Sequence, residues 1–139
     1  TSEERNLIQF IKDRKSNLLT NYDSFQLLRN EEVYKIFDFD TGRGFQPDFL
    51  LFLHGKVGNP NAYYQVFIEP KGKHLAGDDN DGWKQAFLEE ISRRYGTEHI
   101  VMERNSSYVL IGLPFFNTED KGLKSKFTES FEKTILPRH

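Results

Sequence analysis

Two apolar segments joined by a short polar loop constrain the fold of this chain more than any other feature. The first, Asp48 to His54, has the sequence DFLLFLH and is nearly continuous in apolar residues, as expected of a strand that is buried on both faces. The second, Tyr63 to Glu69, has the sequence YYQVFIE and is rich in residues that favour strands. The loop between them is short enough for an antiparallel hairpin. We therefore expect the two segments to pair within one sheet.

The periodicity of the apolar residues predicts the other elements. Helical spacing indicates helices over about residues 2–22, 83–95 and 119–135, the last of them capped by Thr118. β-forming residues indicate further strands over residues 33–40, 99–104 and 107–115. The order α-β-β-β-α-β-β-α predicts a three-layer α/β/α sandwich with a central mixed sheet. We expect a single domain over residues 1–139.

Composition limits the classes of function. The formal net charge is −2 and the pI is about 6.1, whereas domains that bind nucleic acid unaided are more often basic. The absence of cysteine excludes disulfides and thiolate metal sites. No apolar run approaches the length of a membrane-spanning helix, and the charged N-terminal segment does not resemble a signal peptide. We therefore expect a cytoplasmic protein, in which any action on nucleic acid would need a local site or a larger assembly.

The second apolar segment leads into Glu69-Pro70-Lys71, so that charged residues stand where a core strand ends. Because strand side chains alternate between faces, Glu69 and Lys71 point to one face and Pro70 to the other. Antiparallel pairing brings the start of the first strand beside the end of the second, which places Asp48 next to Glu69. The sequence thus predicts two carboxylates and an ammonium group at one edge of the sheet.

Two adjacent carboxylates raise each other's pKa and destabilise the site unless a cation joins them. Mg²⁺, or Mn²⁺ in its place, is the expected cation, because it takes oxygen ligands and is commonly held by one or two carboxylates plus a substrate phosphate. We expect Asp48 and Glu69 to bind the metal, with the carbonyl of Pro70 as an additional ligand. Lys71 would orient the attacking water or help to deprotonate it.

The triplet of an acidic residue, any residue and lysine carries little information alone. The chain contains two more such triplets, Asp13-Arg14-Lys15 and Glu119-Asp120-Lys121. Both fall in predicted helices, where residues i and i+2 do not share a face. Only the triplet at Glu69 ends an apolar strand, and the single Pro-Asp of the chain opens the strand before it. The joint arrangement is therefore more specific than the triplet.

PDFLLFL, a loop and QVFIEPKG together resemble the PD-(D/E)xK nuclease signature, with Asp48, Glu69 and Lys71 in the motif positions. Over about residues 34–88 the chain resembles the C-terminal endonuclease domain of type III restriction enzymes. The resemblance implies a restriction-endonuclease-like core that cuts double-stranded DNA with Mg²⁺. In that family the domain follows an ATP-dependent helicase-like motor and works with a modification (methyltransferase) subunit. The motor's GxxxxGK[ST] motif is absent here, so we expect the nuclease part of a larger protein.

Simpler interpretations stay open for these residues. Asp48, Glu69 and Lys71 also fit a structural ion pair at a sheet edge, which contributes little stability. Glu31 and Glu32 are candidates for a further metal ligand, although paired glutamates before a strand are usually solvated. The chain also fits a non-catalytic DNA-clamping or interaction domain that keeps the nuclease fold, or a repair or transposon-encoded nuclease with the same core.

The residues downstream of the motif give weaker signals. Trp83 and Phe87 share a face of a predicted helix and are expected in the core rather than as a base-stacking platform. Lys73 and Lys84 are candidate phosphate contacts by position alone. For the other polar residues of this region we expect loop positions or solvated side chains: His74, Asp78, Asp79 and Asp81.

Overall fold

The computed structural model describes residues 2–31, 35–37, 42–56, 59–71, 82–95, 100–103 and 106–136. Within these ranges five strands form one mixed sheet, in the order β1 (Tyr22–Arg29), β4 (Phe49–Lys56), β5 (Asn59–Ile68), β7 (Ser106–Gly112) and β6 (Ile100–Glu103). β5 and β7 are parallel, and the other neighbouring strands are antiparallel. The predicted central mixed sheet is confirmed.

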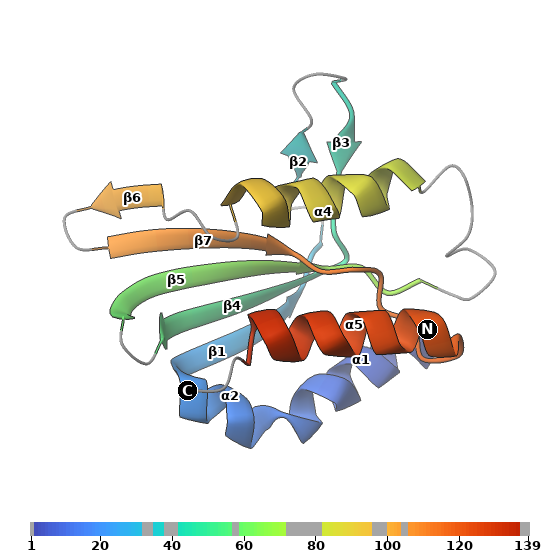
Figure 1. The fold of residues 1–139 in the computed structure, drawn as a ribbon, viewed down its shortest axis with the longest axis horizontal. Coiled ribbons are helices and arrows are strands. Elements are labelled where there is room, and N and C mark those ends of the chain that lie inside the picture. The colour runs from blue at the N-terminus through green and yellow to red at the C-terminus, as the bar shows by residue number, and fades with distance from the viewer. Residues whose placement is uncertain are drawn as a thin grey trace.

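Helices lie on both faces of this sheet, which gives three layers (Figure 1). One face is covered by α4 (Gly82–Tyr95), and the other by α1 (Ser2–Asp13), α2 (Lys15–Asn21) and α5 (Lys121–Thr134). The predicted α/β class is therefore confirmed. In the described part of the chain, no helix combines the length and the apolar character that a membrane span requires.

The predicted hairpin forms the middle of the sheet. β4 and β5 pair antiparallel, with Phe49 opposite Ile68 and Leu53 opposite Tyr64. Along β4, Leu51 is completely buried on the face of α1 and α5, and Leu50 is buried on the face of α4. The apolar run of β4 is thus explained by burial on both faces.

Two hydrophobic cores lie on the two sides of the sheet. The larger core joins α1, α2 and α5 to the sheet and includes the completely buried Leu7, Leu18 and Phe127. The smaller core joins α4 to the sheet and includes Leu88 and Phe67. Burial of this apolar area is the main favourable contribution to folding.

The segment that follows β7 is anchored to both cores. A Cβ atom at Gly112 would collide with the backbone of Leu88, so glycine is needed where α4 approaches the end of β7. Phe115 then packs in the smaller core and Phe116 in the larger one. The Phe116 ring makes edge-to-face contacts with Phe10, at a centroid distance of 5.7 Å, and with Phe127, at 4.9 Å. This segment is therefore fixed from both sides.

β1 is a strand that the sequence pattern does not predict. It pairs antiparallel with β4, from Tyr22 opposite Lys56 to Arg29 opposite Phe49. β1 lies at the edge of the sheet, and Tyr22 is its one buried residue. Phe25 and Leu27 are partly buried between exposed neighbours, so the alternation of β1 is confined to a short stretch and is a weak signal in the sequence.

The predicted strand over residues 33–40 does not join the central sheet in its described part. β2 (Ile36–Phe37) pairs instead with β3 (Gly44–Phe45) in a separate two-stranded sheet. Residues 32–34 and 38–41 lie outside the described residues. The prediction is wrong about the sheet because β1 occupies the position beside β4 that the predicted strand would need.

Helix boundaries differ from the prediction at two places. The predicted helix over residues 2–22 is divided at Arg14 into α1 and α2. The N-cap of α5 is Asp120 and not Thr118, because the Asp120 side chain accepts a hydrogen bond from the backbone N–H of Leu123. Thr118 instead donates its backbone N–H and its hydroxyl to Glu3. The predicted helix 83–95 is confirmed as α4. The predicted strands 99–104 and 107–115 correspond to β6 and β7, but β7 ends at Gly112, and residues 99 and 104 lie outside the described residues.

Leu18 and Leu19 are neighbours in α2, but Leu18 is completely buried and Leu19 is 49% exposed. We expect Leu18→Ala to lower the free energy of unfolding by about 2–5 kcal/mol, because it leaves a cavity in the larger core. Leu19→Ala, the same change in the same helix, should alter that energy by less than about 0.5 kcal/mol. Urea unfolding followed by circular dichroism measures both values, and equal losses would contradict the described packing.

Candidate functional site

Asp48 and Glu69 meet at the open end of the β4–β5 hairpin, opposite its turn. Phe49 pairs with Ile68, so the next positions outward are Asp48 and Glu69. The backbone N–H of Asp48 donates to Oε1 of Glu69 at 3.1 Å. The predicted proximity of the two residues is therefore confirmed. This end of the hairpin lies where the β5 arrow ends in Figure 1.

The backbone before β4 is held by Asn30, the residue that follows β1. The backbone N–H of Asn30 donates to the carbonyl of Asp48 at 2.8 Å. Its side-chain amide donates to the carbonyl of Pro47 at 2.9 Å. The position of Asp48 is thus fixed by the edge strand as well as by the hairpin.

Glu69 is a buried carboxyl group, only 2% exposed, whereas Asp48 is exposed. Burial raises the pKa of Glu69 to about 8, and the Asp48 carboxylate and a side-chain hydrogen bond with Asp48 contribute to the increase. Without a metal, Glu69 therefore keeps its proton near neutral pH. The two residues then form an acid–carboxylate pair that shares one negative charge.

Lys71 is half-buried near this pair. Its charge acts to lower the pKa of Glu69, in opposition to burial and Asp48. Its Nζ lies 5.9 Å from the centroid of the Phe115 ring, and Phe115 belongs to the α4 core. The ammonium group is therefore on the α4 side, as the alternation of the strand predicts.

The backbone of residues 69–71 is bound to the segment after β7. The N–H of Phe116 donates to the carbonyl of Glu69 at 2.9 Å, and the N–H of Lys71 donates to the carbonyl of Phe116 at the same distance. Pro70, between them, is buried and forms a parallel bridge with Phe116. The role of its carbonyl as a metal ligand stays a prediction.

The donor set at this end of the hairpin consists of two carboxylates. Among the residues that the structure describes, no three or more His, Cys, Asp or Glu side chains form a group that could hold a metal. Glu31 therefore does not complete such a group with Asp48 and Glu69, and Glu32 lies outside the described residues. Two carboxylates still fit Mg²⁺, which keeps several waters and takes further oxygens from a substrate phosphate.

The other residues considered in the sequence lie elsewhere or outside the described ranges. Trp83 and Phe87 stack at a centroid distance of 6.4 Å and pack against the smaller core, as predicted. The Nζ of Lys84 lies 5.6 Å from the centroid of the Phe45 ring. The candidate phosphate contact Lys73 lies outside the described residues. The same holds for the four residues expected in loops or as solvated side chains: His74, Asp78, Asp79 and Asp81.

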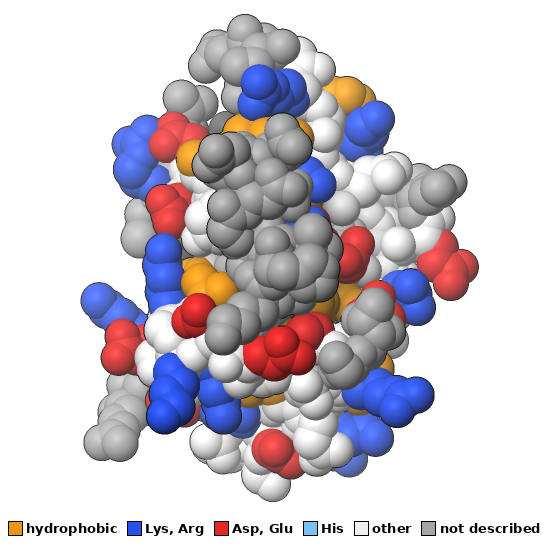
Figure 2. All heavy atoms as spheres, turned by 90° about the vertical axis from the view of Figure 1, so that its right-hand side faces the viewer, with side chains coloured by type: hydrophobic (Ala, Val, Ile, Leu, Met, Phe, Trp, Pro, Cys, Tyr) orange, Lys and Arg blue, Asp and Glu red, His pale blue; other side chains and the backbone are white. Residues whose placement is uncertain are grey.

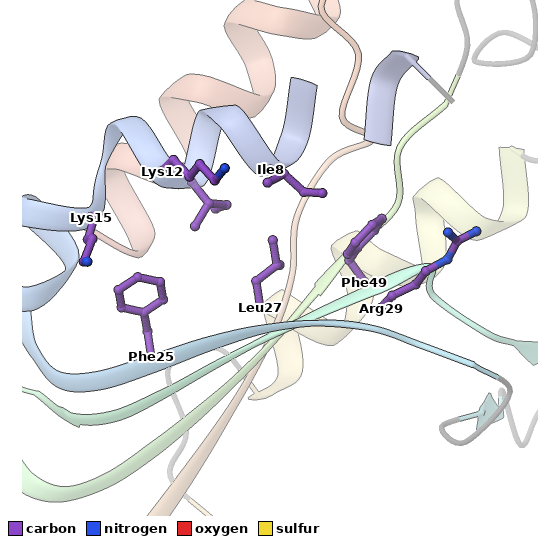
Figure 3. Close-up of a pocket in the computed structure, with 8 residues that line it drawn as sticks. Ile8, Lys12, Lys15, Phe25, Leu27, Arg29 and Phe49 are labelled. Atoms are coloured by element: carbon purple, nitrogen blue, oxygen red, sulfur yellow. The ribbon is translucent and has the colours of Figure 1, made fainter. Parts of the chain in front are cut away.

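A groove of about 390 Å³ lies on the opposite face of the sheet, between α1 and β1 (Figure 3). Its lining is mostly apolar and includes Phe25 and Leu27 from β1 and Ile8 from α1. Lys12 and Arg29 are among the basic residues that line it, and its lining includes no carboxylate. It therefore lacks the oxygen ligands that a hard metal ion requires.

The charges on the face of the molecule in Figure 2 are mixed. Figure 2 views the molecule from the right-hand side of Figure 1, and basic and acidic side chains are interspersed on this face. A continuous basic surface, the usual footprint of a domain that binds nucleic acid alone, is not formed by the described residues in this view.

Comparison with known proteins places the chain in a family. A family model described as HI_1054_C, a C-terminal domain, matches residues 1–136. The chain belongs to this family. It is 46% identical to a Haemophilus influenzae protein described as uncharacterized, in a match that covers 94% of this chain and 30% of that protein. This HI_1054_C domain thus spans less than a third of the relative that it matches. No solved structure matches the chain.

Three amide side chains that the sequence pattern does not single out hold the site in place. They are Asn30, Gln85 and Asn117. Oε1 of Gln85, on α4, accepts the backbone N–H of Phe115 at 3.1 Å. Asn117 donates to the carbonyl of Lys71 at 2.5 Å. The preference of asparagine for turns before helices is the one signal that points to Asn117.

The raised pKa of Glu69 predicts a pH-dependent stability. The folded protein binds the Glu69 proton more tightly than the unfolded chain does, so the stabilisation is fully present below pH 4.5 and is lost as the pH rises through about 8. Each pKa unit corresponds to about 1.4 kcal/mol, so we expect a loss on the order of a few kcal/mol.

Glu69→Gln keeps a neutral group of the same size and should remove this dependence. Urea unfolding at pH 5 and at pH 8.5, without metal, measures the effect. The variant should gain stability relative to the natural protein at the higher pH. Parallel pH profiles for the two proteins would show that Glu69 ionises normally in the fold.

Proposed function

We propose that this chain is a Mg²⁺-dependent endonuclease domain that hydrolyses phosphodiester bonds of double-stranded DNA. The single observation that carries the proposal is the buried Glu69, with its pKa raised to about 8, against Asp48 and near Lys71 at one end of the hairpin. Strongly perturbed carboxyl groups with named charged neighbours are typical of functional sites. The proposal includes the finer fold assignment, a restriction-endonuclease-like core most similar to that of type III restriction enzymes.

The charges of the three residues favour a divalent cation. The net charge of the three side chains is −1 when Asp48 and Glu69 are ionised and Lys71 is charged. In a buried setting a proton on Glu69 neutralises this charge. A divalent ion in place of that proton brings the net charge to +1. A site with this charge attracts a phosphodiester anion. The arrangement therefore suits metal binding coupled to phosphate binding better than a structural ion pair.

The residues have distinct roles in hydrolysis. Asp48 and Glu69 hold the cation, Asp48 from the exposed side and Glu69 from the buried side. When bound, Mg²⁺ would polarise a phosphoryl oxygen and stabilise the charge that develops on it. Lys71, as an ammonium group, would orient the attacking water and help to deprotonate it by stabilising the hydroxide that forms, while the proton passes to solvent. The water oxygen bonds to phosphorus, the P–O bond to the leaving sugar oxygen breaks, and that oxygen takes a proton from solvent.

The substrate would be delivered by other parts of the protein. The net charge of −2 and the mixed charges in Figure 2 favour a catalytic module that binds DNA weakly by itself. The match to a C-terminal domain, and to 30% of a longer relative, supports a place beside further domains. We propose a helicase-like motor in the same chain and a modification (methyltransferase) subunit as partners.

One observation favours a second candidate, a non-catalytic DNA-clamping or interaction domain. No group of three or more candidate ligands occurs among the described residues, whereas a dedicated metal cage would show one. A repair or transposon-type nuclease with the same core shares the proposed site and differs in its partners. A measurement of metal binding separates the non-catalytic domain from the nuclease proposal, because only the nuclease requires a bound divalent ion.

Metal binding should release a proton. Because Glu69 is protonated near neutral pH and binds Mg²⁺ only when ionised, we expect release of up to about one proton per Mg²⁺ bound at pH 7. Titration calorimetry in buffers with different ionisation enthalpies measures this number. Asp48→Asn should weaken binding about tenfold or more, whereas Asp13→Asn, a carboxylate in another triplet, should leave it unchanged. Binding without proton release would contradict the role of Glu69.

Cleavage tests the function itself. The 139-residue chain and the full-length protein that carries it are incubated with duplex DNA and Mg²⁺ or Mn²⁺. We expect Lys71→Ala to reduce the cleavage rate by about 100-fold or more, as loss of a general acid–base group does. Lys15→Ala, the matched lysine of another triplet, should cut at the natural rate. Cleavage by the full-length protein that survives Lys71→Ala unchanged would overturn the catalytic assignment.

A further inference from the structure

Asn117 is a completely buried polar residue next to the candidate site. Its side-chain amide donates to the carbonyl of Lys71 at 2.5 Å. Its Oδ1 accepts the backbone N–H groups of Glu119 at 2.9 Å and Asp120 at 2.8 Å. The amide nitrogen and oxygen of the Asn117 side chain thus connect the backbone of Lys71, the proposed catalytic lysine, to the start of α5.

This amide continues a series of hydrogen bonds beyond the end of the parallel strands. The pairing of β5 with β7 ends at Phe67 opposite Gly112. It is followed by hydrogen bonds from Leu113 to Phe67, from Phe116 to Glu69, and from Lys71 to Phe116. The Asn117 amide adds a side-chain hydrogen bond at the end of this series, on the carbonyl of Lys71 itself.

The support for Asn117 is rigid. Phe116, the residue before it, is buried in the larger core and makes edge-to-face contacts with the rings of Phe10 and Phe127. Thr118, the residue after it, binds the buried carboxylate of Glu3 on α1 through its N–H and its hydroxyl. Asp120 caps α5. A displacement of Asn117 would therefore have to disturb two helices.

We propose that Asn117 is a positioning residue for Lys71, and this inference rests on the proposed nuclease function. Lysine carries its charge at the end of a flexible four-carbon chain, so the backbone from which it starts must be fixed if the ammonium group is to be placed accurately. Small misplacements of a catalytic group cost about 100-fold in rate. Asn117 holds Lys71 but donates to neither carboxylate, so it acts on the catalytic step and not on metal binding.

Asn117→Asp tests the donor alone. The introduced carboxylate keeps an acceptor for Glu119 and Asp120 but loses the amide donor and faces the carbonyl of Lys71. We expect kcat for DNA cleavage to fall about 10- to 100-fold at pH 8, with the Mg²⁺ concentration for half-maximal rate unchanged. At lower pH the introduced carboxyl group gains a proton and becomes a donor again, so the ratio of the natural rate to the variant rate should shrink.

Two further variants separate positioning from stability. Asn117→Ser keeps a short acceptor for the turn but cannot reach the carbonyl of Lys71, so it should lose a similar factor in kcat without recovery at low pH. Asp120→Ala removes the cap of the same helix end and leaves Lys71 alone. It should cut DNA at the natural rate at temperatures where all variants are folded.

Amide hydrogen exchange gives a readout that does not need activity. The Lys71 amide should exchange about tenfold faster or more in Asn117→Asp and Asn117→Ser, whereas the amide of Val66 within β5 and the Asp120→Ala variant should show no such change. If the natural protein cuts no DNA, the proposed function fails, and exchange still decides whether Asn117 holds Lys71. Unchanged exchange at Lys71, or natural cleavage rates in both Asn117 variants of an active protein, would overturn the inference.

Discussion

The buried carboxyl group of Glu69 is the constraint on which the arrangement of this domain depends. A carboxyl group that is 2% exposed and lies beside Asp48 must carry a proton or be matched by a cation, because an isolated buried charge is too costly. Lys71 relieves only part of that cost, since the pKa of Glu69 remains raised to about 8. The fold thus retains a group that destabilises it near neutral pH, and strongly perturbed groups of this kind are typical of functional sites.

The scaffold explains how such a group is held in place. β4 and β5 are the central pair of the sheet, and the residues of β4 contribute to the cores on both faces, so their open end cannot shift without disturbing both. Phe115 and Phe116 extend the same principle to the segment after β7, which binds the backbone of Glu69 and Lys71. The side chains of Asp48, Glu69 and Lys71 thus start from backbone that is held rigidly, and accurate positioning of side chains depends on such support.

The sequence predicts the centre of this structure well and its periphery poorly. The β4–β5 hairpin and the meeting of Asp48 with Glu69 follow from apolar runs and strand alternation, which are strong local signals. β1 escapes prediction because its alternation is short and only partly buried, and the described part of the predicted strand over residues 33–40, Ile36–Phe37, pairs with β3 outside the central sheet. Asn30 and Asn117 escape because their roles depend on contacts between segments far apart in the chain. The pattern of apolar and charged residues therefore identifies charged side chains at strand ends, but not the asparagine side chains that hold the neighbouring backbone.

The central claim is that Asp48 and Glu69 share a divalent metal ion. The most direct measurement is the anomalous scattering of a crystal of this domain grown with Mn²⁺ at pH 8, which locates the ion independently of any activity. The account predicts one peak with an oxygen of Asp48 and an oxygen of Glu69 each at about 2.1–2.2 Å, and Lys71 on the same side of the hairpin. A crystal with no peak there, in which Glu69 is still protonated and hydrogen-bonded to Asp48, would contradict it.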